Sequence, residues 1–131
     1  MNGSQKFDLE ERLVKLAVSI SDLVEALPNT VCGKYLSGQL IRSGLSPALN
    51  YGEARSAESV NDFIHKMKIA LKELRETFVS LKIIKQKHYQ KVSETLDECI
   101  KECNELISIF VKSIQTAEKN RAMSNSNFKN R

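Results

Sequence analysis

Residues 62–84 read DFIHKMKIALKELRETFVSLKII, and this stretch decides the fold class. Its apolar residues recur every three or four positions, which is the spacing of one face of an α-helix. These residues are Phe63, Met67, Ala70, Leu74, Phe78 and Leu81. Ser59 followed three positions later by Asp62 resembles a capping box at a helix start. The stretch therefore predicts a long amphipathic helix over residues 59–85.

Three further segments show the same helical spacing. They are predicted as helices over residues 8–27, 34–53 and 92–119. Asp8 has the position of a capping residue, and Pro28 ends the first of these helices. Pro47 lies inside the second and is expected to bend it or to remove a hydrogen bond. Residues 120–131 lack a periodic apolar face, so they are predicted to form a disordered basic tail.

The pattern as a whole is that of an all-α protein. Strict alternation of polar and apolar residues is absent, so no sheet is expected. Four amphipathic helices with short connections fold most simply as an up-down antiparallel four-helix bundle. No apolar run approaches the roughly 18 residues of a membrane span, and the polar N-terminus is unlike a secretory signal. We therefore expect a cytoplasmic protein with no membrane contact.

Charge is distributed in alternating blocks along the chain, whose net charge is +4. Residues 60–91 carry eight Lys and Arg against three acids, and residues 92–118 carry two against six. Clustered Lys and Arg side chains bind phosphates without regard to sequence. The candidate nucleic-acid-binding residues are Lys66, Lys68, Lys72, Lys82, Lys85, Lys87, Lys91 and Arg121. The same lysines also fit a helix C-terminus or an ordinary solvated surface.

Polar residues form stripes beside the apolar faces of the second and third helices. The candidate structural and assembly residues are Gln39, Arg42, Ser43, Ser46, Asn50, Glu53, Asp62, Glu73 and Glu76. Arg42 is expected to pair with Glu73 or Glu76, because a guanidinium group matches a carboxylate. Spacing alone also fits a solvated helix face.

Signals for chemistry are weak. Cys99 and Cys103 are one turn apart on the apolar face of the fourth helix and are expected to pack in the core. A zinc site needs about four ligands, and neither Cys32 nor the two histidines converge on this pair. There is no Gly-rich phosphate loop and no Cys-His or Ser-His constellation. We expect no catalytic residues, no metal and no cofactor.

Two segments carry a resemblance to a known family. Residues 39–54 read QLIRSGLSPALNYGEA, and residues 62–77 read DFIHKMKIALKELRET. Their order and separation resemble the helix-two and helix-three signatures of the four-helix bundle proteins encoded in 23S ribosomal RNA intervening sequences. The resemblance spans about residues 7–119. It departs at Pro47, where an aliphatic residue is usual, and at Val79-Ser80, where an aromatic residue is common.

The resemblance implies a bacterial, left-handed up-down bundle that assembles as a homopentamer, with the polar stripes serving structure and assembly. A related accessory protein of diversity-generating retroelements binds nucleic acid and a reverse transcriptase through a basic surface. Two hypotheses follow. One is an oligomer associated with RNA, DNA or a nucleic-acid enzyme. The other is a protein–protein adaptor with no nucleic-acid contact.

Overall fold

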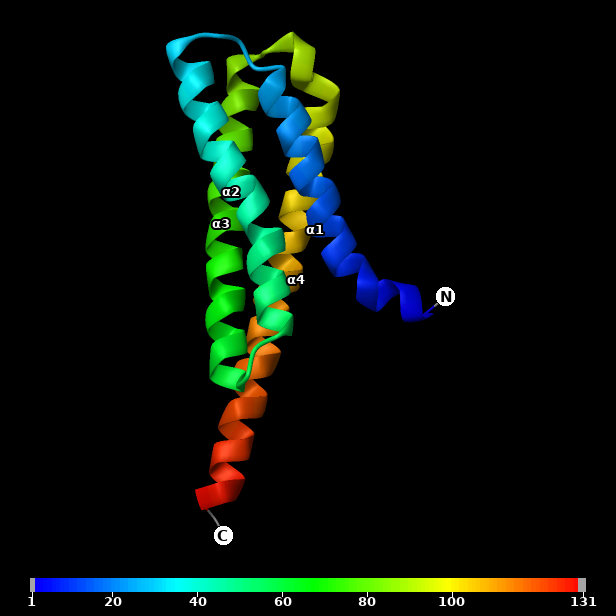
Figure 1. The fold of residues 1–131 in the computed structure, drawn as a ribbon, viewed down its shortest axis with the longest axis vertical. Helices are drawn as coiled ribbons and strands as arrows, with labels where there is room; N and C mark the ends of the chain where they lie inside the picture. The colour runs from blue at the N-terminus through cyan, green and yellow to red at the C-terminus, as the bar shows by residue number, and fades with distance from the viewer. Residues whose placement is uncertain (1, 130–131) are drawn as a thin grey trace.

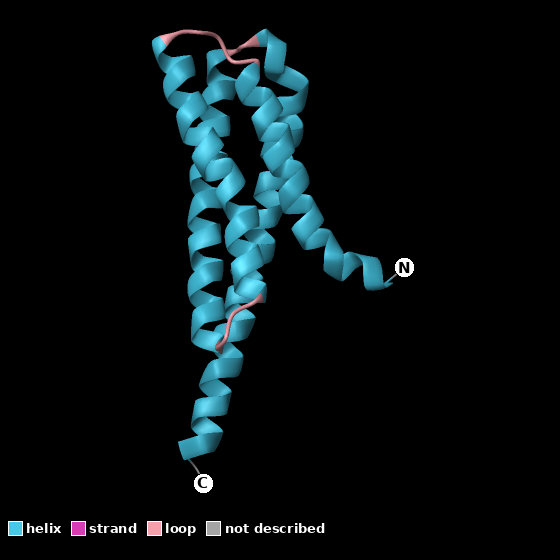
Figure 2. Ribbon diagram, viewed as in Figure 1, coloured by secondary structure: helices cyan, strands magenta, loops and turns pink. Residues whose placement is uncertain are grey.

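The computed structural model describes residues 2–129, and it describes the side chains of residues 9–89 and 91–126. The elements in chain order are α1 (Asn2–Glu25), α2 (Val31–Arg55), α3 (Val60–Lys87), the short 3₁₀ turn η1 (Gln90–Val92) and α4 (Ser93–Lys129). Residues 2–129 contain helices and loops but no strand (Figure 2). The four helices pack in sequence as a bundle, which confirms the predicted fold class (Figure 1). None of these helices has the length and apolarity to cross a membrane.

Successive helices run in opposite directions (Figure 1). Contacts between α2 and α3 agree with this antiparallel arrangement. Arg42 lies beside Glu73, whereas Glu53, which comes later in α2, lies beside Lys66, which comes earlier in α3. The loop between α1 and α2 and the turn between α3 and α4 therefore lie at the same end of the bundle (Figure 1).

Short polar residues define where the helices start. Thr30 accepts a hydrogen bond from the Gly33 amide through Oγ1 at 3.0 Å, so α2 begins at Val31 and not near residue 34 as predicted. Ser59 caps α3 in the same way, accepting from the Asp62 amide at 3.0 Å. α3 ends at Lys87, and His88 directly after it adopts the left-handed conformation with φ of 57°. Such a residue lets the last carbonyl groups find partners as the chain turns.

The core confirms most of the predicted apolar faces but corrects the second. Leu36 and Leu40 are buried, whereas Leu49 is 70% exposed. Beyond Leu40, the inner face of α2 continues through small residues at Ser43, Gly44, Pro47 and Ala54. This series keeps the period of 3.6 residues, while the step from Leu45 to Leu49 leads outward. α2 continues through Pro47 to Arg55.

Both ends of the chain depart from the predicted boundaries. α1 starts at Asn2 and leans away from the other helices toward the N-terminus, whereas Asp8, the predicted cap, has its side chain outside the described ones (Figure 1). α4 continues to Lys129, so the tail predicted as disordered is helical as far as it is described. Extending an existing helix adds one hydrogen bond per residue without a new nucleus, which explains a helix without an apolar face there.

Candidate functional site

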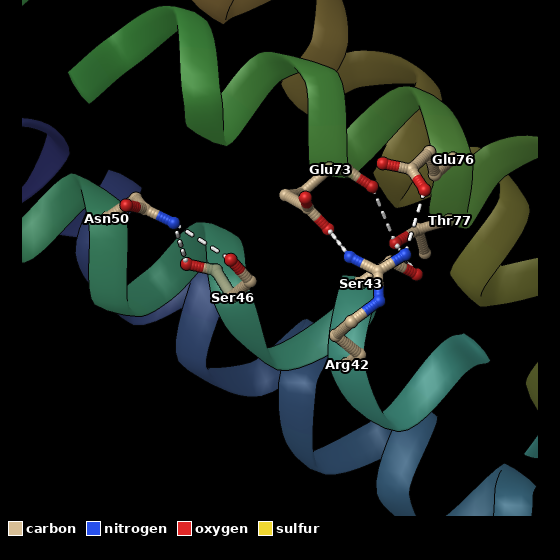
Figure 3. Close-up of polar contacts among 7 residues, drawn as sticks. All are labelled: Arg42, Ser43, Ser46, Asn50, Glu73, Glu76 and Thr77. Atoms are coloured by element: carbon tan, nitrogen blue, oxygen red, sulfur yellow. Dashed lines mark hydrogen bonds and ion pairs between the residues drawn. The ribbon is translucent and has the colours of Figure 1, made fainter. Parts of the chain in front are cut away.

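A polar network joins the middle of α2 to the middle of α3 (Figure 3). Arg42 donates from Nη1 to Glu73 Oε2 at 2.7 Å and from Nη2 to Glu76 Oε1 at 2.8 Å. The two carboxylates lie one turn apart on α3, so a single guanidinium group reaches both. The hydrogen bond to Glu76 and the charge of Glu73 raise the pKa of Arg42. We call these three residues the α2–α3 fork.

A buried pair of hydroxyl groups lies beneath this fork. Thr77 Oγ1 lies 3.0 Å from Ser43 Oγ and 2.9 Å from the Glu73 carbonyl oxygen. Both side chains are inaccessible to water, with exposed fractions of 0% for Thr77 and 1% for Ser43. Sequence reasoning identified Ser43 but missed Thr77, whose position between the apolar Leu74 and Leu81 on the inner face of α3 was the available signal.

The other residues of the predicted stripes lie outside this network. Asn50 donates from Nδ2 to Ser46 Oγ at 2.8 Å, a contact within α2 (Figure 3). Lys66, near the start of α3, donates to Glu53 Oε1 at 2.8 Å. Of the remaining two residues, Asp62 lies in the first turn of α3, and Gln39 lies on the outer side of α2. The stripe is thus several local contacts and not one continuous site.

A second arginine fork links α1 to α4, and sequence reasoning missed it. Arg12 donates from Nε to Glu102 Oε2 at 2.8 Å and from Nη2 to Glu102 Oε1 at 2.7 Å. Glu105, one turn further along α4, lies 3.5 Å from Nη2. The hydrogen bond to Glu102 is the main cause of the raised pKa of Arg12. The available signal was the spacing of Glu102 and Glu105, which matches that of Glu73 and Glu76.

Half of the candidate nucleic-acid-binding residues already have a partner within the chain. Lys66 pairs with Glu53, Lys68 with Glu118 at 3.0 Å and Lys85 with Asp97 at 3.0 Å, as the ion pairs show. Arg121 donates to Asn61 Oδ1 at 2.9 Å where α3 begins. Acidic α4 thus offsets part of the positive charge of α3.

The other candidates form no ion pair among the side chains that the structure describes. They are Lys72, Lys82, Lys87 and Lys91. Lys82 and Lys87 lie over the rings of Phe78 and Tyr89, with Nζ 5.1 Å and 6.0 Å from the ring centroids. Lys72 stands apart near the middle of α3.

The lysines toward the end of α3 are exposed and close together in sequence. We call Lys82, Lys85, Lys87 and Lys91 the basic end. It lies where α3 turns into α4, and the sequence contains no acid between Glu76 and Glu94. His88 and Tyr89 lie in the same turn, so aromatic rings accompany the positive charges.

The two cysteines of α4 are packed in the core. Burial raises the pKa of Cys99 to about 11 and that of Cys103 to about 12. Cys103 donates from Sγ to the Leu74 carbonyl oxygen at 3.3 Å. In the part of the chain that the structure describes, no three His, Cys, Asp or Glu side chains converge as metal ligands. The burial and the raised pKa values of these thiols therefore fit a role in core packing and not a role as nucleophiles.

Comparison with known proteins identifies relatives of the chain. Residues 5–112 match the sequence profile of the 23S rRNA-intervening sequence protein. The chain is similar to a protein of unknown function from the S23 ribosomal protein family of Bacteroides thetaiotaomicron, known from a crystal structure. The two are 31% identical with a TM-score of 0.71, over 81% of this chain and 97% of that one. No curated protein matches.

Proposed function

The chain belongs to the family of 23S rRNA-intervening sequence proteins, and from this premise we propose that it is a non-enzymatic, oligomeric bundle that binds RNA or DNA through its basic end. The observation that carries the proposal is the segment from Thr77 to Ser93, which holds four lysines and no acid. Three of those lysines, Lys82, Lys87 and Lys91, form no ion pair with any described side chain.

The physical basis is the release of counterions from phosphates. Each lysine that neutralises a phosphate frees a bound cation, so affinity falls steeply as salt rises. Tyr89 lies beside Lys87 and is only half-buried, which gives an unpaired base a ring to stack on. The basic end therefore fits a single-stranded nucleic acid better than a protein partner.

Assembly strengthens the proposal. We propose a homopentamer, in which five copies of the basic end act on one nucleic acid and multiply a modest affinity. The resemblance to the accessory protein of diversity-generating retroelements extends the proposed partners to a nucleic-acid enzyme such as a reverse transcriptase. The alternative is an adaptor that binds a protein and no nucleic acid, and the following experiment separates the two.

Filter binding to a single-stranded RNA and to a DNA duplex at two salt concentrations tests the proposal. Three phosphate contacts on a single strand predict an affinity that falls about 20-fold between about 50 and 200 mM salt. Reversing the three unpaired lysines as Lys82→Glu, Lys87→Glu and Lys91→Glu should abolish retention at the lower salt.

The matched control reverses three exposed lysines of α4. Lys101→Glu, Lys112→Glu and Lys119→Glu change the net charge by the same amount, and the proposal expects them to retain most of the affinity. Equal losses in both triple variants would mean that only the net charge matters. No retention of the unmodified protein at low salt would refute nucleic-acid binding and favour the adaptor.

A further inference from the structure

An apolar groove runs along the outer side of the bundle between α2 and α3. Its lining includes Tyr35, Gln39, Lys72, Arg75, Val79 and Ile83. Tyr35, Val79 and Ile83 are 65%, 55% and 45% exposed. Apolar side chains gathered on a surface of this kind mark a contact with another protein.

The groove is positively charged at one end. Lys72 and Arg75 form no ion pair with any described side chain. The acid that lines the groove, Glu76, is already bound to Arg42 at 2.8 Å. Val79 and Ile83 are apolar and offer no hydrogen-bond donor to a phosphate group. The groove therefore fits a partner surface that is apolar along most of its length and acidic at one end.

The outer face of α1 has the complementary pattern. It presents Glu11, Val14, Val18, Asp22 and Glu25, all of them exposed. Val14 is 48% and Val18 56% exposed, and neither Asp22 nor Glu25 forms an ion pair among the described side chains. Lys15 lies beside this ridge, whose charge is still negative. We call these five residues the α1 ridge.

The spacing of the ridge matches the spacing of the groove. Along α1 the steps from Val14 to Val18, Asp22 and Glu25 are four, four and three residues. Read backward along α3, Ile83, Val79, Arg75 and Lys72 are separated by the same steps. Two antiparallel helices would thus place valine on apolar side chains and each acid on a base.

We propose that the α1 ridge of one copy docks antiparallel in the α2–α3 groove of the next. The pairs are Val14 with Ile83, Val18 with Val79, Asp22 with Arg75 and Glu25 with Lys72. The ridge and the groove are different surfaces, so each copy can use its ridge with one neighbour and its groove with another. Repetition of such a contact closes a ring or extends a filament. This inference rests on the proposed assembly and is independent of nucleic-acid binding.

Charge reversal with analytical ultracentrifugation tests the docking. Lys72→Glu with Arg75→Glu alters the groove, and Asp22→Lys with Glu25→Lys alters the ridge. Each double variant should sediment as a monomer at concentrations where the unmodified protein is an oligomer. All four substitutions in one chain restore opposite charges across the contact, so the oligomer should return.

A matched control places the charge change of the ridge variant elsewhere. Glu94→Lys with Glu98→Lys alters exposed acids of α4 and should leave the oligomer intact, and circular dichroism verifies that every variant is helical. A monomeric unmodified protein would overturn the assembly and the docking together. An oligomer that survives both double variants, or that the fourfold variant does not restore, would overturn the docking alone.

Discussion

Neighbouring residues of α2 face different partners, and the two contacts are built differently. Gly44 lies against α1, where a Cβ at this position would come within 2.8 Å of Ile20 Cδ1 and Cγ2. Ser43 faces α3, where its hydroxyl group lies 3.0 Å from that of Thr77. The contact with α1 depends on shape and the contact with α3 on polarity. One turn of α2 thus distinguishes its two neighbours.

The shape-dependent contact is the more sensitive one. Gly44→Ala should lower the free energy of unfolding by about 2–3 kcal/mol, because overfilled cores typically lose about 1–3 kcal/mol. Ile20 is itself fully buried, so its side chain has no solvent to move into. Urea denaturation followed by circular dichroism measures the change.

Gly38 provides the control for this substitution. A Cβ at Gly38 would meet nothing within 4 Å, so the alanine adds no clash. Gly38→Ala should raise the free energy of unfolding by about 0.5–1 kcal/mol, the advantage of alanine over glycine inside a helix. A similar gain for Gly44→Ala would mean that α1 and α2 are not in close contact.

The polarity-dependent contact should respond to loss of a hydroxyl group. Thr77→Val keeps the shape but leaves Ser43 buried without this partner, which should destabilise the fold by about 1–2 kcal/mol. Adding Ser43→Ala removes both hydroxyl groups, so the double variant should lose less than the sum of the single losses. Thermal and urea unfolding of the three variants give the coupling, and strictly additive losses would contradict it.

The contact between α3 and α4 differs from these two contacts because its contribution to stability depends on pH. The folded-state pKa values of Cys99 and Cys103 are raised to about 11 and about 12, so folding favours the neutral thiols. Their contribution is complete below the unfolded pKa of about 8.5 and declines as the pH rises above it. At pH 9 the two thiols together should already cost about as much stability as Thr77→Val, and the loss should grow toward pH 11.

Melting temperatures measured from pH 7.5 to pH 11 follow this loss. Lysines and tyrosines titrate in the same range, so the comparison is with Cys99→Ala combined with Cys103→Ala. That variant should be less stable at pH 7.5 because it loses packing, yet its melting temperature should fall less steeply with pH. An identical slope would mean that the thiols contribute nothing to the alkaline loss.

The sequence predicted best what depends on periodicity. Apolar spacing located four helices, and complementary charge at one-turn spacing placed Arg42 near Glu73 and Glu76. Leu49 was misplaced because small residues such as Gly44 carry no hydropathy signal, although they set the buried face of α2. The pairing of Arg12 with Glu102 joins residues 90 positions apart. The one-turn spacing of Glu102 and Glu105 indicates a place for an arginine, but which arginine binds there depends on how α1 and α4 meet.

The smallest expected difference in stability is between the two arginine forks. Arg12 is 30% exposed and bidentate to Glu102, whereas Arg42 is 51% exposed and divides its contacts between two acids. A double-mutant cycle of Arg12→Ala with Glu102→Ala should give a coupling of about 0.2–1 kcal/mol, the range of solvent-accessible ion pairs. The cycle of Arg42→Ala with Glu76→Ala should give a smaller coupling, because water screens the more exposed arginine better.

Salt separates these forks further. Raising the ionic strength should reduce both couplings, with the larger fractional loss at Arg42. Amide hydrogen exchange adds a local measure, because the side chain of Arg12 links α1 to Glu102 of α4. Arg12→Ala should therefore speed exchange in α1 alone, whereas Arg42→Ala leaves the hydroxyl pair beneath it to hold α2 against α3. Faster exchange throughout the bundle in the Arg12 variant would show that α1 does not open independently of the other three helices.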